Sequence, residues 1–174
     1  TEEYDPGTGL VPISHLADRP QRMEQRVTEV DDGDGGTTET RVKTPIWFDP
    51  QAKNGTPMCQ ALDLAAQSLR DWIDQHPQSF PPIVLNVTDG EATDGDPLRY
   101  AQELRSFATD DGEVLLFNVH LSASEKPPVE LPSTTDEVPK DDEYAEVLFQ
   151  MSSRLPFSMR SAAEQEGYSV TLDT

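Results

Sequence analysis

One stretch decides the fold: residues 81–91, with the sequence PPIVLNVTDGE. Apolar residues at successive positions predict a strand that is buried on both faces, as central strands of parallel α/β sheets are. The run ends at Asp89, where Gly90 allows the backbone to turn sharply. Ligands of such sheets bind beyond the carboxyl ends of the strands, so Asp89 is a candidate site residue. A plain Asp-Gly turn without function is an equal alternative.

A helix is predicted immediately before this strand, over residues 57–76. Its apolar side chains recur at steps of three and four residues, which predicts one buried stripe. The stripe consists of Met58, Leu62, Ala65, Leu69, Trp72 and Ile73. Thr56 directly precedes Pro57, so we expect Thr56 to be the N-cap and Pro57 the first helical residue.

The chain after Asp89 predicts a second helix and a second buried strand. Asp96 is a candidate N-cap for a helix that begins at Pro97, and the apolar run at residues 114–121 predicts the strand. A strand, a helix and a parallel strand in succession form a right-handed crossover unit. Further along we expect an irregular segment at residues 122–140, helices at 142–151 and 157–165, and a β-prone end at 168–172.

The chain before the helix predicts a β-hairpin. Residues 1–19 read as loop with a short helical turn near residues 15–17, and residues 23–30 and 37–48 are β-prone. The acidic, glycine-rich tip at residues 31–36 does not match a helix-loop-helix calcium loop. Glycines fall at its ligand positions and no Glu falls at the twelfth, so a solvated turn is favoured.

Composition limits the classes of function. A chain of 174 residues predicts one domain, with a loop and hairpin region at residues 1–48 and an α/β core at 49–174. The net charge of −20 repels phosphate backbones and anionic lipid, so neither nucleic acid nor a membrane is an expected partner. A single cysteine, Cys59, cannot form an internal disulfide, and we expect a cytoplasmic protein.

The order of predicted elements indicates an α/β fold with a doubly wound, mostly parallel sheet. Over residues 44–121 the chain resembles a von Willebrand factor A domain, whose fold is Rossmann-like. Asn54-Gly55-Thr56-Pro57-Met58 is similar to the second metal motif of that family, and Val87-Thr88-Asp89-Gly90-Glu91 is similar to the third. The resemblance implies a metal-ion-dependent adhesion site that holds Mg²⁺ through Thr56 and Asp89. It further implies a partner protein that offers a carboxylate to the metal.

The sequence departs from this family at its beginning. The first metal motif, Asp-x-Ser-x-Ser after the first strand, is absent, and the family's first strand has no counterpart before the hairpin. The domain is therefore expected to be incomplete at the N-terminus, with an apolar sheet edge beside residues 83–87. A fragment, a strand supplied by another polypeptide, and residues dropped from the numbering are the three explanations. We favour residues that are lost or separately supplied.

The expected function is that of a non-enzymatic interaction module. The resemblance is to bacterial cytoplasmic members of the family, which serve in stress-response or signalling assemblies. The alternative is a metal-dependent hydrolase that uses Asp89, Asp94 and Asp96. Cys59 as a thiol nucleophile is a further alternative, but a thiol packed in or near the core is favoured because no local motif pairs Cys59 with a histidine.

Overall fold

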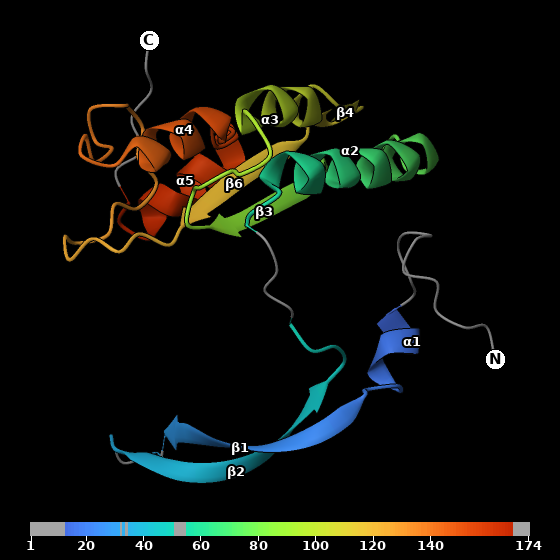
Figure 1. Cartoon of the computed structure of the whole chain (residues 1–174), viewed down its shortest axis with the longest axis vertical. Coiled ribbons are helices and arrows are strands. Elements are labelled where there is room, and N and C mark those ends of the chain that lie inside the picture. The colour runs from blue at the N-terminus through green and yellow to red at the C-terminus, as the bar shows by residue number, and fades with distance from the viewer. Residues whose placement is uncertain (1–12, 32, 34, 51–54, 169–174) are drawn as a thin grey trace. The chain divides into compact units, whose positions relative to one another are not determined.

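The computed structural model describes residues 13–31, 33, 35–50 and 55–168. The chain divides into two compact units, Thr1–Asn54 and Gly55–Thr174 (Figure 1). Each unit is described by itself. Among the described residues, no helix is both long enough and apolar enough to cross a membrane. The predicted β-prone end at residues 168–172 lies outside the described residues from position 169 onward.

The first unit contains the predicted hairpin. Strands β1 (Arg22–Asp31) and β2 (Thr37–Ile46) pair antiparallel, from Arg22 opposite Ile46 to Asp31 opposite Thr37. The predicted helical turn is present as α1 (Ile13–Ala17). Nearly every residue of the hairpin is exposed, so the hairpin buries no core of its own. A two-stranded ribbon of this kind is marginally stable by itself.

The second unit confirms the mixed α/β class and contains one parallel strand pair. Strands β3 (Ile83–Thr88) and β6 (Leu115–His120) pair in parallel, with α3 (Pro97–Arg105) between them in sequence. Both strands and the crossover helix were predicted. Two short strands, β4 (Ala108–Thr109) and β5 (Gly112–Glu113), form a small hairpin before β6 that the sequence did not reveal.

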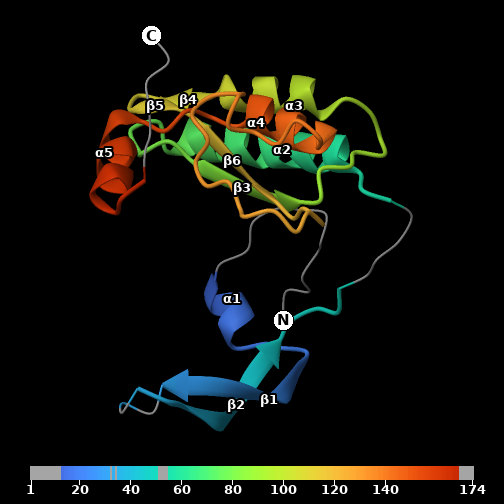
Figure 2. The same ribbon diagram turned by 90° about the vertical axis from the view of Figure 1, so that its left-hand side faces the viewer.

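Helices cover one face of the β3–β6 pair (Figure 2). These helices are α2 (Met58–Gln75), α3 and α4 (Glu143–Met151). The bounds of α2 and α4 were predicted within one residue, and α3 begins at the predicted Pro97. The core is formed by these three helices, by β6 and by Val114, the residue before β6. It contains Met58, Leu62, Ala101, Leu104, Val114, Leu116, Leu148 and Met151. The last helix, α5 (Phe157–Gln165), has the predicted bounds but contributes no buried residue.

The prediction that β3 is buried on both faces is wrong. Ile83, Leu85 and Val87 are 45%, 67% and 59% exposed, whereas Val84 and Asn86 are half-buried. Successive strand residues point to opposite faces, so one row lies toward the helices and the other is open. The apolar run predicted two covered faces, but the described part of the second unit provides helices on only one.

A polar contact links the two strands inside the unit. Asn86 donates a 2.8 Å hydrogen bond to the Oδ1 of Asn118, its partner in the parallel register. The Nδ2 of Asn118 donates to the Leu148 carbonyl at 3.0 Å and to the Ser152 hydroxyl at 2.9 Å. These bonds join β3, β6 and the end of α4. They favour a single strand register, because a slip by one residue would leave part-buried amide groups unpaired.

Candidate functional site

The prediction that Thr56 caps the helix after it is wrong. Helix α2 begins at Met58, so Pro57 and not Thr56 occupies the N-cap position, and no side chain at that position accepts a capping hydrogen bond. Thr56 contributes backbone groups instead: its carbonyl accepts from the N–H of Met58 at 2.8 Å. The hydroxyl of Thr56 has no hydrogen-bond partner among the described residues.

Asp94, which lies in the loop after β3, caps α2 instead. Its Oδ1 accepts the N–H of Cys59 at 3.0 Å, and its Oδ2 accepts the N–H of Gln60 at 2.9 Å. Desolvation acts to raise the pKa of Asp94, but the N–H groups of Gln60 and Cys59 outweigh it and the pKa is lowered. No local sequence signal identifies this cap, because Asp94 lies 35 residues after Cys59.

The same loop connects Thr56 to the end of β3. The N–H of Thr56 donates to the Thr93 hydroxyl at 2.9 Å, and the N–H of Thr93 donates to the Thr56 carbonyl at 3.0 Å. The first residue of α2, Met58, lies with its sulfur 3.9 Å from the Asn86 amide of β3. Thr56 and Asp89 therefore lie at the same end of the β3–β6 pair, where the carboxyl ends of both strands meet.

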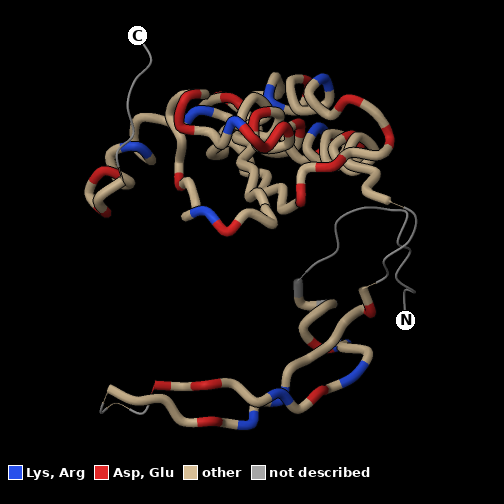
Figure 3. The backbone as a smooth tube through the Cα atoms, turned by 60° about the vertical axis from the view of Figure 1, so that its left-hand side comes forward, with Lys and Arg blue, Asp and Glu red and all other residues tan. Residues whose placement is uncertain are grey.

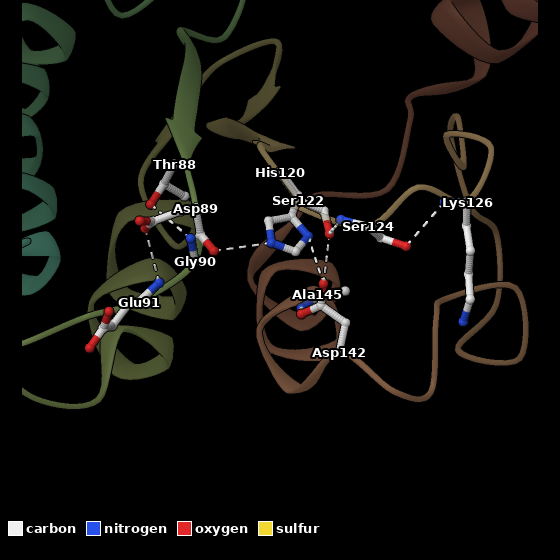
Figure 4. Close-up of polar contacts among 10 residues, drawn as sticks. All are labelled: Thr88, Asp89, Gly90, Glu91, His120, Ser122, Ser124, Lys126, Asp142 and Ala145. Carbon is white, nitrogen blue, oxygen red and sulfur yellow. Dashed lines mark hydrogen bonds and ion pairs between the residues drawn. The ribbon is translucent and has the colours of Figure 1, made fainter.

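The backbone around Asp89 is held by hydrogen bonds from residues of both strands, and Asp142 at the start of α4 lies beside the His120 ring (Figure 4). The Nε2–H of His120 donates to the Asp89 carbonyl at 3.0 Å, since a carbonyl can only accept. The Thr88 hydroxyl accepts the N–H of Gly90 at 3.0 Å. The Asp89 carboxylate accepts one bond, from the N–H of Glu91 at 3.3 Å, through Oδ1. The second oxygen of this carboxylate accepts no hydrogen bond from the part of the chain that the structure describes.

A pocket of about 460 Å³ lies beside Asp89. Asp89, Glu91, Asp141, Asp142 and Glu143 line it together with His120 and Tyr144, among other residues. The pKa of Tyr144 is raised, first by the charge of Glu91 and then by burial and the other acidic side chains. Acidic residues recur along the loops of this unit (Figure 3), so the pocket attracts cations rather than anions.

The donor groups present fit part of a Mg²⁺ site. Thr56 and Asp89 provide a hydroxyl and a carboxylate oxygen, which are the ligand types that Mg²⁺ prefers, and Mg²⁺ commonly keeps several waters. Asp94 also offsets the positive end of α2 that would otherwise oppose a cation near Thr56. Within the described residues, no three His, Cys, Asp or Glu side chains are placed to hold a metal together.

The residues of the hydrolase alternative have other roles in the structure. Both oxygens of Asp94 accept N–H groups of α2, and Asp96 is the N-cap of α3, where it accepts the N–H of Leu98 at 3.0 Å as predicted. Cys59 is buried near the core. Burial, and then Asp94, raise the pKa of the Cys59 thiol, which favours the unreactive protonated form.

Comparison of the chain with protein-family models, with curated proteins and with solved structures gives no match. The resemblance to a von Willebrand factor A domain therefore rests on the two motifs around Thr56 and Asp89 and on their placement at one end of the strand pair.

Proposed function

We propose that this chain is a metal-ion-dependent protein–protein interaction module of the von Willebrand factor A type. One observation carries the proposal: the loop from Asp89 to Thr93 joins the end of β3 to Thr56 through two hydrogen bonds. Among the described residues the Thr56 hydroxyl has no partner and the Asp89 carboxylate accepts a single bond, and both residues lie at one end of the strand pair. Mg²⁺ held between them would keep an open coordination position for a carboxylate of the partner.

The proposal includes the larger fold. The β3–α3–β6 crossover is one unit of a doubly wound, Rossmann-like sheet, and the resemblance implies more strands on the far side of β3. A segment from outside these 174 residues would supply the neighbouring strand. The single cysteine supports a cytoplasmic location, and the resemblance to bacterial family members supports a role in a stress-response or signalling assembly.

A binding role is favoured over hydrolysis by the hydrogen bonds of the acidic residues. Asp94 and Asp96 stabilise helix starts with the oxygens that a hydrolytic metal cluster would need. His120 uses its Nε2–H on the Asp89 carbonyl, while Ser122 donates to Asp142 rather than to His120. No described serine or cysteine therefore pairs with His120 as a nucleophile does with its general base.

Direct ion binding tests the proposal. Mn²⁺, a paramagnetic substitute for Mg²⁺, would be titrated into the protein, and the free ion would be measured by electron paramagnetic resonance. Asp89→Asn removes the anionic ligand and Thr56→Val removes the hydroxyl at nearly constant volume. Each is expected to weaken Mn²⁺ binding about tenfold or more, which corresponds to about 1.4 kcal/mol.

The matched control is Asp111→Asn. Asp111 lies in the turn between β4 and β5, where Gly112 approaches Pro81 at the opposite end of β3. The Asp111→Asn substitution removes the same charge from the chain as Asp89→Asn and should leave Mn²⁺ binding unchanged.

A peptide with one Asp side chain should then bind only with Mn²⁺ present, and its Asn counterpart should not bind. Equal Mn²⁺ affinity of the native chain, Asp89→Asn and Thr56→Val would overturn the proposal.

A further inference from the structure

The hydrogen bonds of β3 all run toward β6. The Leu115 N–H donates to the Pro82 carbonyl at 3.0 Å, and the Leu121 N–H donates to the Thr88 carbonyl at 2.8 Å. Between these two bonds the strands pair residue for residue in parallel. In a parallel pair, alternate residues of each strand direct both backbone groups to the partner. The N–H and C=O groups of Ile83, Leu85 and Val87 therefore point away from β6.

Within the described part of the second unit, these outward backbone groups have no partner. The outer edge of β6 differs. Leu116 donates its N–H to the Ser153 hydroxyl at 2.9 Å, and its carbonyl accepts the N–H of Ser153 at 2.6 Å. The segment after α4 thus satisfies part of the β6 edge, whereas no described residue of the second unit pairs with the donors and acceptors along the β3 edge. A row of such groups is a template for pairing with another strand.

The side chains of the same three residues are also available. Ile83, Leu85 and Val87 form an apolar row on the open face of the strand pair. Val119, which is paired with Val87, extends this row onto β6 and is exposed as well. A strand added beside β3 would satisfy backbone groups through its main chain and would cover part of this row with alternate side chains.

We propose that the outer edge of β3 is a strand-addition site for an extended segment of a partner polypeptide. The segment is apolar in its middle, so that it matches Ile83, Leu85 and Val87, and carries Lys or Arg at the end that lies beside Asp89. This inference deepens the proposed function and rests on it for the expectation that a further strand lies beside β3. It assigns that strand to a partner and states its chemistry. The backbone ladder along β3 does not use the Thr56 hydroxyl, whereas the basic end of the segment would face the Asp89 carboxylate.

Charge distinguishes this occupant from a second copy of the chain. The chain carries a net charge of −20, so two copies repel each other at moderate salt. Asp89 and Glu91 follow β3 directly, which places two carboxylates at the carboxyl end of the edge. A basic residue at that end of the incoming segment would gain from both, and electrostatic attraction would also speed association.

Hydrogen exchange of individual amides, followed by NMR, tests the proposal in excess EDTA, so that the result is independent of any metal site. In the free protein the outward amides of Ile83, Leu85 and Val87 should exchange faster than the inward amides of Val84, Asn86 and Thr88. The probe is a synthetic peptide with alternating Val and Ile in its middle and Lys at its ends. Its addition should slow the outward amides about tenfold or more.

Two controls isolate the strand pairing. A peptide with Pro at alternate central positions lacks the donors for a ladder and should give no protection. Leu85→Pro removes an outward N–H without removing a bond to β6, so it should reduce peptide binding while the inward amides stay protected. If Leu85→Pro does not fold, Leu85→Lys replaces it as the test variant, because it retains the backbone N–H. Leu85→Lys should weaken peptide binding because it interrupts the apolar row.

Three results would overturn the proposal. In the first, the outward amides of the dilute free protein are as protected from hydrogen exchange as the inward amides. This would mean that another part of the chain covers the β3 edge. Protection that rises with protein concentration in the absence of peptide would identify a second copy as the occupant. Equal protection by the proline-containing peptide would mean that the peptide does not bind as a strand.

Discussion

The carboxylate of Asp94 accepts a 3.0 Å hydrogen bond from the backbone N–H of Cys59, and thereby caps a helix from a loop that follows the next strand. The second oxygen of Asp94 accepts the N–H of Gln60. A helix start leaves such N–H groups without intrahelical partners. The loop after β3 therefore stabilises α2 and at the same time holds Thr93 against Thr56.

Removal of the Asp94 carboxylate should destabilise the second unit. Asp94→Ala leaves the N–H groups of Cys59 and Gln60 without their acceptor, and Asp94→Asn retains one acceptor oxygen but not the charge. We expect a lower urea midpoint for both, with the larger decrease for Asp94→Ala. Asp71→Ala is the control, since Asp71 is an exposed residue of α2 whose carboxylate makes no described contact. Equal midpoints for Asp94→Ala and Asp71→Ala would contradict this role.

The stabilisation by Asp94 should depend on pH in the acid range. Its pKa in the folded protein lies below the ordinary value of 3.8, so near that pH the unfolded chain binds the proton more readily. The contribution is therefore fully present above pH 3.8 and is lost as the pH falls through the lower folded value. The difference in urea midpoint between the native chain and Asp94→Asn should be constant above about pH 5 and should shrink below pH 3.8. If the difference in urea midpoint grew below pH 3.8, the pKa of Asp94 would be raised and not lowered in the folded protein.

Local signals in the sequence predicted the helices and the paired strands. The Asp96 cap of α3 and the bounds of α5 depend on neighbouring residues, and both are confirmed. The apolar stripe of α2 is confirmed in part: Met58 and Leu62 are buried and Ala65, Leu69 and Ile73 pack partly buried against the core, but Trp72 does not join it. The cap at the start of α2 was predicted wrongly. Thr56 has the expected residue type and position, but the competing acceptor comes from Asp94, which lies 35 residues beyond Cys59. Propensity cannot identify a contact of that separation.

The burial of β3 failed for a different reason. A run of successive apolar residues shows that both faces of a strand are suited to burial, but it does not say which chain supplies the cover. Leu85 is the clearest case, because it is 67% exposed although it lies in the middle of the run. At the candidate site, the pairing of His120 with the Asp89 carbonyl could not be predicted either, since it depends on the register of β3 and β6.

Gly90 allows β3 to end against α4. Its φ of 93° lies in the left-handed region, and a Cβ added at this position would lie 2.4 Å from the Cβ of Tyr144. Gly167 has nearly the same φ, 92°, but a Cβ there would meet nothing within 4 Å. Comparison of alanine substitutions at the two positions therefore separates the free-energy cost of the left-handed backbone conformation from that of the close approach to α4.

Gly90→Ala should reduce the free energy of unfolding by about 1–3 kcal/mol more than Gly167→Ala, because only the first substitution forces α4 away from β3. Urea unfolding of both variants measures the difference. The close contact involves the Cβ of Tyr144, so Tyr144→Phe should not rescue Gly90→Ala, whereas Tyr144→Gly should recover part of the loss. Equal destabilisation by the two alanine variants would mean that the start of α4 moves aside at little cost and that the approach of Tyr144 does not restrict position 90.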